Sequence, residues 1–473
     1  MLLLDTSESI ASFSSMEAWN WLIHFFIIAL ALLLANVFRR NIPILRKSLM
    51  PSALIAGCFI LLLKLIPGFE NILNKQAMEI VTYHALGLGF VALALKNNRI
   101  QSRSTTTKII ETGCVTASTY VLQGIIGLAV TIPLFLWWNR ETFFYSSGLL
   151  LPMGYGQGPG QALNFGVIYQ NSATDQGISF SGADFGLALA AMGFIVGSVI
   201  GVIYMNILRR KNKLSIKNGD YHEQYTLSDY EDKNEIPHSE SIDKLTVQLC
   251  LVLVVYSGVY GIMKGVECLE LGAFGTKTIK PMVWGFNFLW GTLLGVLMKS
   301  ILNGFKRAKI MKREYINNYM LNRISGTCFD VMIVAGTAAI SFENLSSIWL
   351  PFLLVAILGA IATFWYLNKV CAQLYPDYSY EGFFSMFGML TGTASNGMIL
   401  LREIDPKFET PAANNLVLQT IPAIVFGFPV LLLMGYAPQG FKQTIISLVL
   451  LVLFFVITSL WLFRTKIFKK KNK

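Results

Sequence analysis

The chain has 473 residues, of which 54% are hydrophobic and 14% are charged, and its mean hydropathy is +0.55. Soluble domains carry about a quarter of their residues as charged side chains, so this composition indicates a polytopic membrane protein. The net charge of +11 is spread over short loops between apolar runs. That placement orients membrane proteins, and we expect no nucleic-acid partner.

The apolar runs predict an all-α protein that crosses the bilayer repeatedly. The predicted spans are 19–38, 49–66, 78–95, 112–138, 182–208, 245–263, 281–301, 327–343, 348–367, 412–435 and 443–463. A polar segment at 209–243 divides them and is predicted to be a cytoplasmic linker. The segment 443–473 follows both groups and is expected to add an eleventh transmembrane helix with a basic cytoplasmic tail.

Two further apolar segments, 146–166 and 383–401, are interrupted by glycine. The first contains glycine at positions 154, 156, 158 and 160 together with Pro159, and the second contains FGMLTGTASNGMI. Glycine and proline disfavour a continuous helix, and each arm is too short to cross a hydrocarbon core of about 30 Å. Unpaired backbone is tolerated at membrane depth where it lines a cavity. We therefore predict two re-entrant hairpins.

The positions of lysine and arginine support this interpretation. With the N-terminus outside and both hairpins returning to their own side, the inside loops contain 31 of the 38 basic residues. Treating either hairpin as a full crossing would invert every later loop. The halves 19–208 and 244–436 then have opposite orientations, which predicts an inverted repeat of two five-helix halves, each with one re-entrant hairpin. The C-terminus is expected in the cytoplasm.

Paired interrupted helices in the two halves point to a transporter binding site near the midplane. Backbone N–H groups and neutral polar side chains suit a carboxylate, whereas oxygen atoms suit a small cation. The candidate substrate-binding residues are Gly156, Gln157, Gly158, Gln161, Asn164, Thr393, Ser395, Asn396 and Arg402. The candidate cation-binding residues are Gln123, Asp330, Thr391 and Gly392.

In several local motifs, the chain resembles the bacterial glutamate:sodium symporter family. The likeness covers residues 19–436 and includes the arrangement of two inverted halves with glycine-rich loops. It also includes the opening PSALIAG at 51–57, the motif LGLG at 86–89, Gln123, and GTASNG at 392–397. The first family loop typically reads Ser-Gly-Gly-His-Gly-Thr-Gly, and here its His and Thr positions are Gln157 and Pro159.

The resemblance implies a homodimer in the bacterial cytoplasmic (inner) membrane. It also implies uptake driven by a sodium gradient and an elevator-like movement of a domain that carries both loops. We therefore expect sodium-coupled symport of glutamate or a related small anionic solute, with sodium as the coupling ion and no resident cofactor or metal.

Two other functional classes are alternatives to sodium-coupled symport. A proton-coupled antiporter or exporter of a small organic anion is the alternative within transport, although Asp330 is its main candidate for a buried acid. An enzyme would need a nucleophile, a base or a metal cluster at membrane depth. The chain contains four scattered histidines and no HExxH or GxSxG motif, so we expect no enzymatic activity.

Overall fold

The computed structural model describes residues 16–69, 72–96, 105–137, 141–214, 244–272, 275–311, 315–406 and 408–464. Within these ranges the regular elements are helices, and nine of them are long and apolar enough to cross a membrane. The nine are α1 (Met16–Asn41), α4 (Lys75–Leu95), α5 (Thr106–Trp137), α8 (Gly182–Arg210), α9 (Lys244–Glu267), α12 (Asn287–Arg307), α15 (Trp349–Leu374), α19 (Thr420–Tyr436) continued by η6 to Gln439, and α20 (Phe441–Leu462). The expectation of an all-α polytopic membrane protein is confirmed at this level.

The remaining helices are shorter or more polar and lie between the nine. They are α2 (Pro43–Lys47), α3 (Ser52–Leu63), η2 (Tyr145–Leu149), α6 (Leu150–Pro152), η3 (Met153–Gln157), α7 (Pro159–Thr174), η5 (Gly275–Ile279), α11 (Lys280–Gly285), α13 (Asn318–Ala339), α14 (Phe342–Ser346), α16 (Ser379–Leu390), α17 (Ala394–Arg402), α18 (Ala412–Leu418) and η6 (Ala437–Gln439).

Several predicted spans differ from the helices in the structure. The span 49–66 corresponds to α3, which has only 12 residues. The span 327–343 overlaps α13, which begins nine residues earlier, ends at Ala339 and includes polar residues such as Arg323. Phe286 separates α11 from α12, and Gln419 separates α18 from α19, so 281–301 and 412–435 are each divided. Residues 215–243 and 465–473, in the predicted linker and tail, lie outside the described residues.

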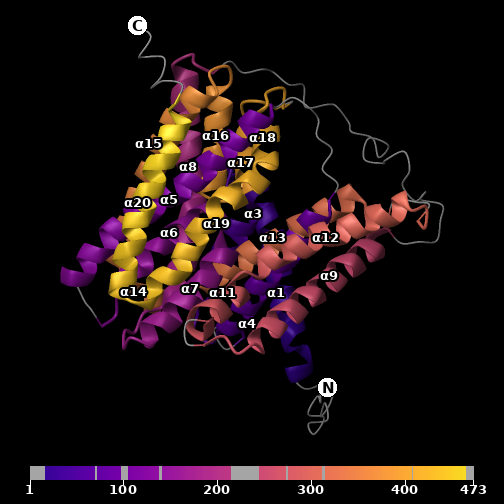
Figure 1. Ribbon diagram of the computed structural model, residues 1–473, viewed down its shortest axis with the longest axis vertical. Helices are drawn as coiled ribbons and strands as arrows, with labels where there is room; N and C mark the ends of the chain where they lie inside the picture. The colour runs from indigo at the N-terminus through magenta and orange to yellow at the C-terminus, as the bar shows by residue number, and fades with distance from the viewer. Residues whose placement is uncertain are drawn as a thin grey trace.

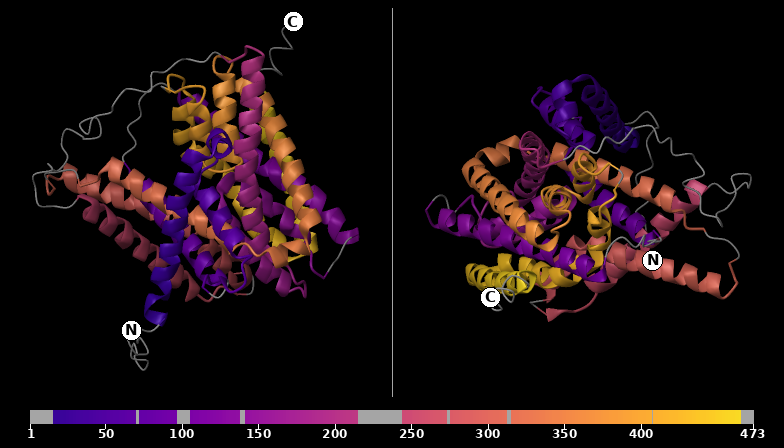
Figure 2. Two further views of the ribbon diagram at one scale, coloured as in Figure 1. Left: turned by 180° about the vertical axis from the view of Figure 1, so that it is seen from behind. Right: turned by 90° about the horizontal axis from the view of Figure 1, so that it is seen from above.

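The helices form a long bundle with a tilted group at one side. Helices α5, α8, α15 and α20 run along the long axis, while α9, α12 and α13 cross the other side obliquely (Figure 1). Views from behind and from above show the same division (Figure 2). The start of α1 and the end of α20 lie at opposite ends of the bundle (Figure 1). The two interrupted segments lie inside the bundle, where α5 and α8 pass beside them.

Buried ionic contacts join helices at one end of the bundle. Asp184, at the start of α8, is 1% exposed and accepts from Lys75 Nζ at 2.7 Å and Asn344 Nδ2 at 2.7 Å. Its second oxygen accepts from the backbone N–H of Ser341 at 2.9 Å. Nearby, Lys64 Nζ donates to the carbonyl of Ala338 at 2.8 Å. This network joins the helix ends of α3, α4, α8 and α13.

Helix α20 is fixed to α5 and its neighbours at both of its ends. Near its start, the hydroxyl of Thr444 lies 2.8 Å from that of Ser146, at the base of the first interrupted segment. Beyond its end, Arg464 donates to the buried carboxylate of Glu111 at 2.8 Å. Lys108 donates to the same carboxylate at 2.9 Å. The additional helix is therefore an integral part of the bundle.

The Asp184 network predicts the effect of a near-isosteric change. Asp184→Asn removes the buried charge that pairs with Lys75 at 2.7 Å, which leaves a buried amide and only the longer ion pair between Lys75 and Glu79. Hydrogen bonds and ion pairs to a buried carboxylate contribute strongly to the free energy of unfolding. We therefore expect Asp184→Asn to lose about 2 kcal/mol of stability, measured by thermal unfolding in detergent. Glu79→Gln is the control, since Glu79 lies 3.8 Å from Lys75 and is more exposed. Equal melting temperatures for the two variants would contradict the assignment.

Candidate binding site between two interrupted helices

The first interrupted segment changes direction at a single glycine. Helical turns η2, α6 and η3 lead to Gly158, which has φ +83° and ψ −177°, and α7 then begins at Pro159. A positive φ is readily adopted by glycine and strained for other residues. Pro159 suits the first position of a helix because its missing N–H would have no intrahelical partner there. The helix is therefore interrupted at Gly158 and Pro159, whose backbone preferences allow a turn followed by a new helix.

The two arms of this segment meet at their bases. The backbone N–H of Ser179, after α7, donates to the carbonyl of Glu141, before η2, at 2.7 Å. The rings of Phe143 and Phe180 lie 6.4 Å apart, and the Tyr145 hydroxyl donates to Gln176. The two arms of the first segment are therefore joined by backbone, ring and side-chain contacts.

The second interrupted segment is formed by α16 and α17, which pack side by side. Thr391, Gly392 and Thr393 separate the helices, and α17 begins after Thr393, which has extended backbone angles. The arms touch through two glycines, since a Cβ added at Gly388 would lie 2.7 Å from Gly397 Cα. A Cβ at Gly397 would overlap the carbonyl oxygen of Ser385. Larger residues at either position would force the arms apart.

Helix α5 donates a hydrogen bond to a carbonyl in each interruption. The hydroxyl of Tyr120 donates to Gly156 O at 3.0 Å, and Gln123 Nε2 donates to Leu390 O at 3.0 Å. Each of these carbonyls belongs to the residue two positions before the interrupting glycine, Gly158 or Gly392. A terminating helix leaves its last carbonyls without intrahelical partners, and buried groups of this kind need a donor. One helix, α5, therefore supplies a hydrogen-bond donor to a carbonyl in each interruption.

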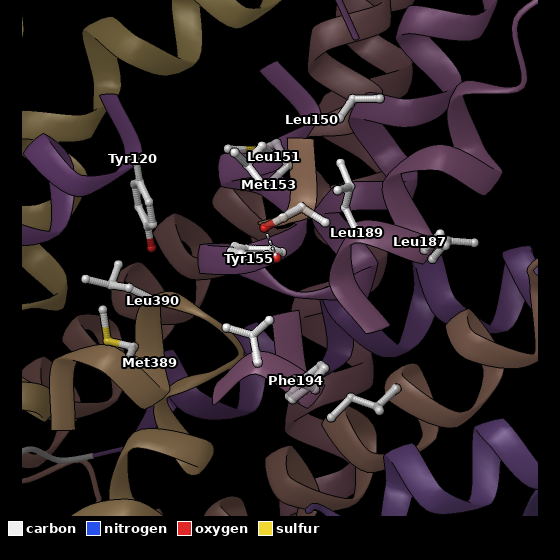
Figure 3. Packing of buried hydrophobic residues seen from close by; sticks show 14 of the residues in the cluster. Tyr120, Leu150, Leu151, Met153, Tyr155, Leu187, Leu189, Phe194, Met389 and Leu390 are labelled. Carbon is white, nitrogen blue, oxygen red and sulfur yellow. Dashed lines mark hydrogen bonds between the residues drawn. The ribbon is translucent and has the colours of Figure 1, made fainter. Parts of the chain in front are cut away.

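Helix α8 approaches the second interruption through glycines spaced four residues apart. A Cβ at Gly193 would lie 2.7 Å from Thr391 O, and one at Gly197 would lie 3.5 Å from Thr391 Cβ. One turn further, a Cβ at Gly201 would lie 3.0 Å from Leu400 Cδ1. Small residues allow helices to approach closely in membrane proteins. Figure 3 shows residues of the first segment, including Met153 and Tyr155, between side chains of α8 and of α16.

The tips of the two segments lie in contact beside a cavity. A Cβ at Gly158 would lie 3.4 Å from Thr393 Cγ2 and 3.8 Å from Gly392 O. The adjacent cavity has a volume of about 200 Å³ and is bordered by α4, α5, α12, α13, α18 and α19 as well as both tips. Residues from both halves of the chain therefore line one cavity.

The structure distributes the candidate substrate residues over four environments. Gly156, Gln157, Thr393 and Ser395 line the cavity. Gly158 forms the turn behind them. Gln161, Asn164 and Asn396 are buried beside the tips, and Arg402 is exposed in the last turn of α17 and does not line the cavity.

Buried amides without hydrogen-bond partners surround the tips. Gln161 is three residues after Gly158, Asn396 is three residues after Thr393, and neither side chain has a partner for its nitrogen or oxygen. Buried polar groups usually have partners, so this equivalent pair marks positions where a ligand or water would satisfy them. Asn164 differs, since its Nδ2 donates to Gly285 O at 2.8 Å while its Oδ1 has no partner.

The candidate cation-binding residues also lie in different environments. Thr391 is fully buried and its hydroxyl donates to Phe387 O at 2.7 Å. Gln123 donates to Thr363 and Leu390, while its Oε1 has no partner. Gly392 lies at the tip. Asp330 lies on an exposed face of α13 and does not line the cavity, so the lining gives no support to its role as a cation ligand.

Sequence reasoning missed two contributors to the site. Tyr120 and the α8 glycines lie in ordinary apolar spans, where their residue types are common. The spacing Gly193-x₃-Gly197-x₃-Gly201 was a usable signal for close helix packing, but it does not indicate the partner. The role of Tyr120 had no signal, because the carbonyl that it contacts is 36 residues away.

Comparison with known proteins adds no assignment. No protein-family model matches the chain, and no curated protein matches it. The chemistry of the cavity must therefore be argued from its own residues.

The contact between α8 and the second tip can be tested by crosslinking. In a background without the native cysteines, Gly197→Cys with Thr391→Cys places two Cβ atoms about 3.5 Å apart, within disulfide range. A protease site inserted in 215–243 would cut the chain between the two residues. We expect the oxidised fragments to remain joined without reductant on a denaturing gel. Gly177→Cys with Thr391→Cys is the control, because nothing lies within 4 Å of a Cβ at Gly177. Separate fragments from the first pair would contradict the arrangement.

Proposed function

We propose that this protein is a secondary active transporter that couples sodium entry to uptake of a small anionic solute, glutamate or a related compound. The observation that carries the proposal is the contact between Gly158 and the Gly392–Thr393 turn beside a cavity shared by both halves. Interrupted helices that meet between two repeats are the usual setting for a transporter site. The protein would act in the bacterial cytoplasmic membrane as a homodimer.

The proposed topology is an inverted repeat in which each interrupted segment is re-entrant. The bond between Ser179 N and Glu141 O supports a first segment that returns to its starting side. The close packing of Gly388 on Gly397 supports the same for the second. With the N-terminus outside, the first segment would enter from outside and the second from the cytoplasm.

The anion would bind at the cavity wall formed by the two tips. Helix α17 begins there, with Ala394 and Ser395 in the lining, so its first N–H groups and the positive end of its dipole favour a carboxylate. Gln157, Thr393 and Ser395 add neutral donors at the same wall. No charged side chain is among the described residues that line the cavity, so the backbone would supply most of the stabilisation.

Sodium would bind behind the tips, where oxygen atoms lack partners. Asn396 Oδ1 and Gln123 Oε1 are buried and unpartnered, and Thr391 places a hydroxyl nearby in sequence. Hard cations prefer carbonyl, amide and hydroxyl oxygens. Because these residues border the tip that would hold the anion, each ligand would stabilise the arrangement that favours the other, which is the basis of coupling.

The contacts of the buried acidic residues argue against the proton-coupled alternative. Proton carriers at membrane depth are usually buried acids. The buried acids in the described part of the chain are Glu111, Asp184 and Asp405. Glu111 and Asp184 are paired with cations, and Asp405 accepts from the backbone of Glu409 and Thr410. None of the three lines the cavity.

Transport can be measured in proteoliposomes with labelled glutamate and related carboxylates. We expect uptake that requires an inward sodium gradient and is abolished by a sodium ionophore. Gly158→Val, which strains the turn, and Gly397→Val, which separates the arms, should both lose uptake by at least tenfold. Gly261→Val is the control, because nothing lies within 4 Å of a Cβ there. Uptake that is insensitive to sodium, or full activity in both tip variants, would contradict the proposal.

A second prediction concerns the sodium site. Asn396→Leu removes the unpartnered amide, and we expect the sodium concentration for half-maximal uptake to rise at least tenfold while thermal stability is unchanged or increased. Gln373→Leu is the matched control, since Gln373 is also an unpartnered amide but lies at the end of α15. Unchanged sodium dependence in Asn396→Leu would exclude Asn396 as a sodium ligand.

A further inference from the structure

The cavity beside the tips has a strongly asymmetric lining. Its polar side chains near the tips are uncharged, and most of the remaining surface is contributed by leucine, isoleucine, valine, methionine and phenylalanine. An organic dianion held in such a space would need two charge-stabilising regions. The described lining offers one, at the start of α17.

One apolar wall begins next to the first tip. A Cβ at Gly160 would lie 2.7 Å from Met332 Sδ and 2.8 Å from Leu86 Cδ1, so these side chains already cover the tip. Phe90, one turn beyond Leu86 on α4, packs on Phe288 and Phe329 with ring centroids 5.3 Å and 5.6 Å away. All three rings line the cavity. The wall that begins beside the first tip is therefore aromatic and aliphatic.

A second apolar wall runs along α19. Ala423, Gly427, Val430 and Met434 line the cavity and recur on one face of the helix. At 1.5 Å per residue these positions extend over about 16 Å. The cavity thus has room along its length for a body that reaches away from the tips. Met153, Met332, Met389 and Met434 add flexible side chains that adapt to apolar shapes.

We infer that the substrate of this site is an amphipathic monocarboxylate, with one carboxylate at the tips and an uncharged apolar body against the phenylalanine wall. The inference rests on the proposed function and revises its substrate class: the solute keeps one carboxylate, and a monocarboxylate with an apolar body replaces glutamate. A second carboxylate, as in glutamate, would face Phe90, Phe288 and Phe329 without a donor, and burial of an unpaired charge is costly. Medium-length alkyl, branched or aromatic carboxylic acids satisfy both ends of the cavity.

Binding to the purified full chain tests this inference without any transport step. Protection against thermal unfolding would be measured with butanoate, hexanoate, hexanedioate, glutamate and hexanol in saturating sodium. Each methylene buried on the apolar wall should strengthen binding about fourfold. We therefore expect hexanoate to bind at least tenfold more tightly than butanoate, and at least tenfold more tightly than hexanedioate, which has the same chain length. Hexanol, which lacks the carboxylate, should give no comparable protection.

A variant makes the charge argument specific. Thr292 lines the cavity one turn from Phe288 on α12 and is only half-buried, so Thr292→Arg adds a cation to the apolar wall without removing core volume. We expect hexanedioate or glutamate to bind at least tenfold more tightly to Thr292→Arg than to the unmodified protein, while hexanoate gains nothing. Phe329→Ala should weaken hexanoate about tenfold and leave butanoate nearly unchanged. The comparison requires that each variant has the same melting temperature as the unmodified protein when no ligand is present.

The outcomes separate this inference from the proposed function. Glutamate or hexanedioate binding as tightly as hexanoate would overturn the substrate class while leaving sodium-coupled uptake intact. Equal protection by hexanol would also overturn it, because the carboxylate would then contribute nothing. Tight hexanoate binding with no sodium-driven uptake would support the substrate class and defeat the transport proposal.

Discussion

The structure depends on the satisfaction of backbone groups where helices stop inside an apolar bundle. Each interruption exposes carbonyls at the end of one arm and N–H groups at the start of the next, and no bulk water is available to pair with them. Tyr120 and Gln123, one turn apart on α5, donate to Gly156 O and Leu390 O. The carbonyls are thereby paired, while α17 begins at the cavity wall with Ala394 and Ser395. This division would favour negative charge in the cavity, as the proposed function requires.

Glycine determines how closely these parts approach. Gly388 and Gly397 bring the arms of the second segment together, and the glycines of α8 bring that helix against Thr391. Side chains at these positions would separate the tips and open the cavity wall. The residue type that weakens a helix by its conformational freedom therefore also permits the contacts that hold the interruptions in place.

The sequence was sufficient to predict the helical class and the position of both glycine-containing interruptions. These features depend on local chemistry, namely the apolar runs and the Gly–Pro cluster at 154–160. It was not sufficient for the start of α13, where polar residues such as Asn318 and Arg323 lie inside a helix. Arg402 and Asp330 were chosen by residue type, yet their exposure depends on which face of α17 or α13 packs inward. That choice is set by tertiary contacts, which a single sequence does not reveal.

The position of α20 has a consequence for the order of assembly. Arg464 and Glu111 are 353 positions apart in the chain, and Thr444 meets Ser146 across 298 positions. The outer face of α5 therefore stays uncovered while the whole second half is synthesised and inserted. Until α20 arrives, Glu111 has Lys108 as its partner but lacks Arg464. The lipid or the insertion machinery must shield this face of α5 during biogenesis, and the bundle closes only after both halves are in the bilayer.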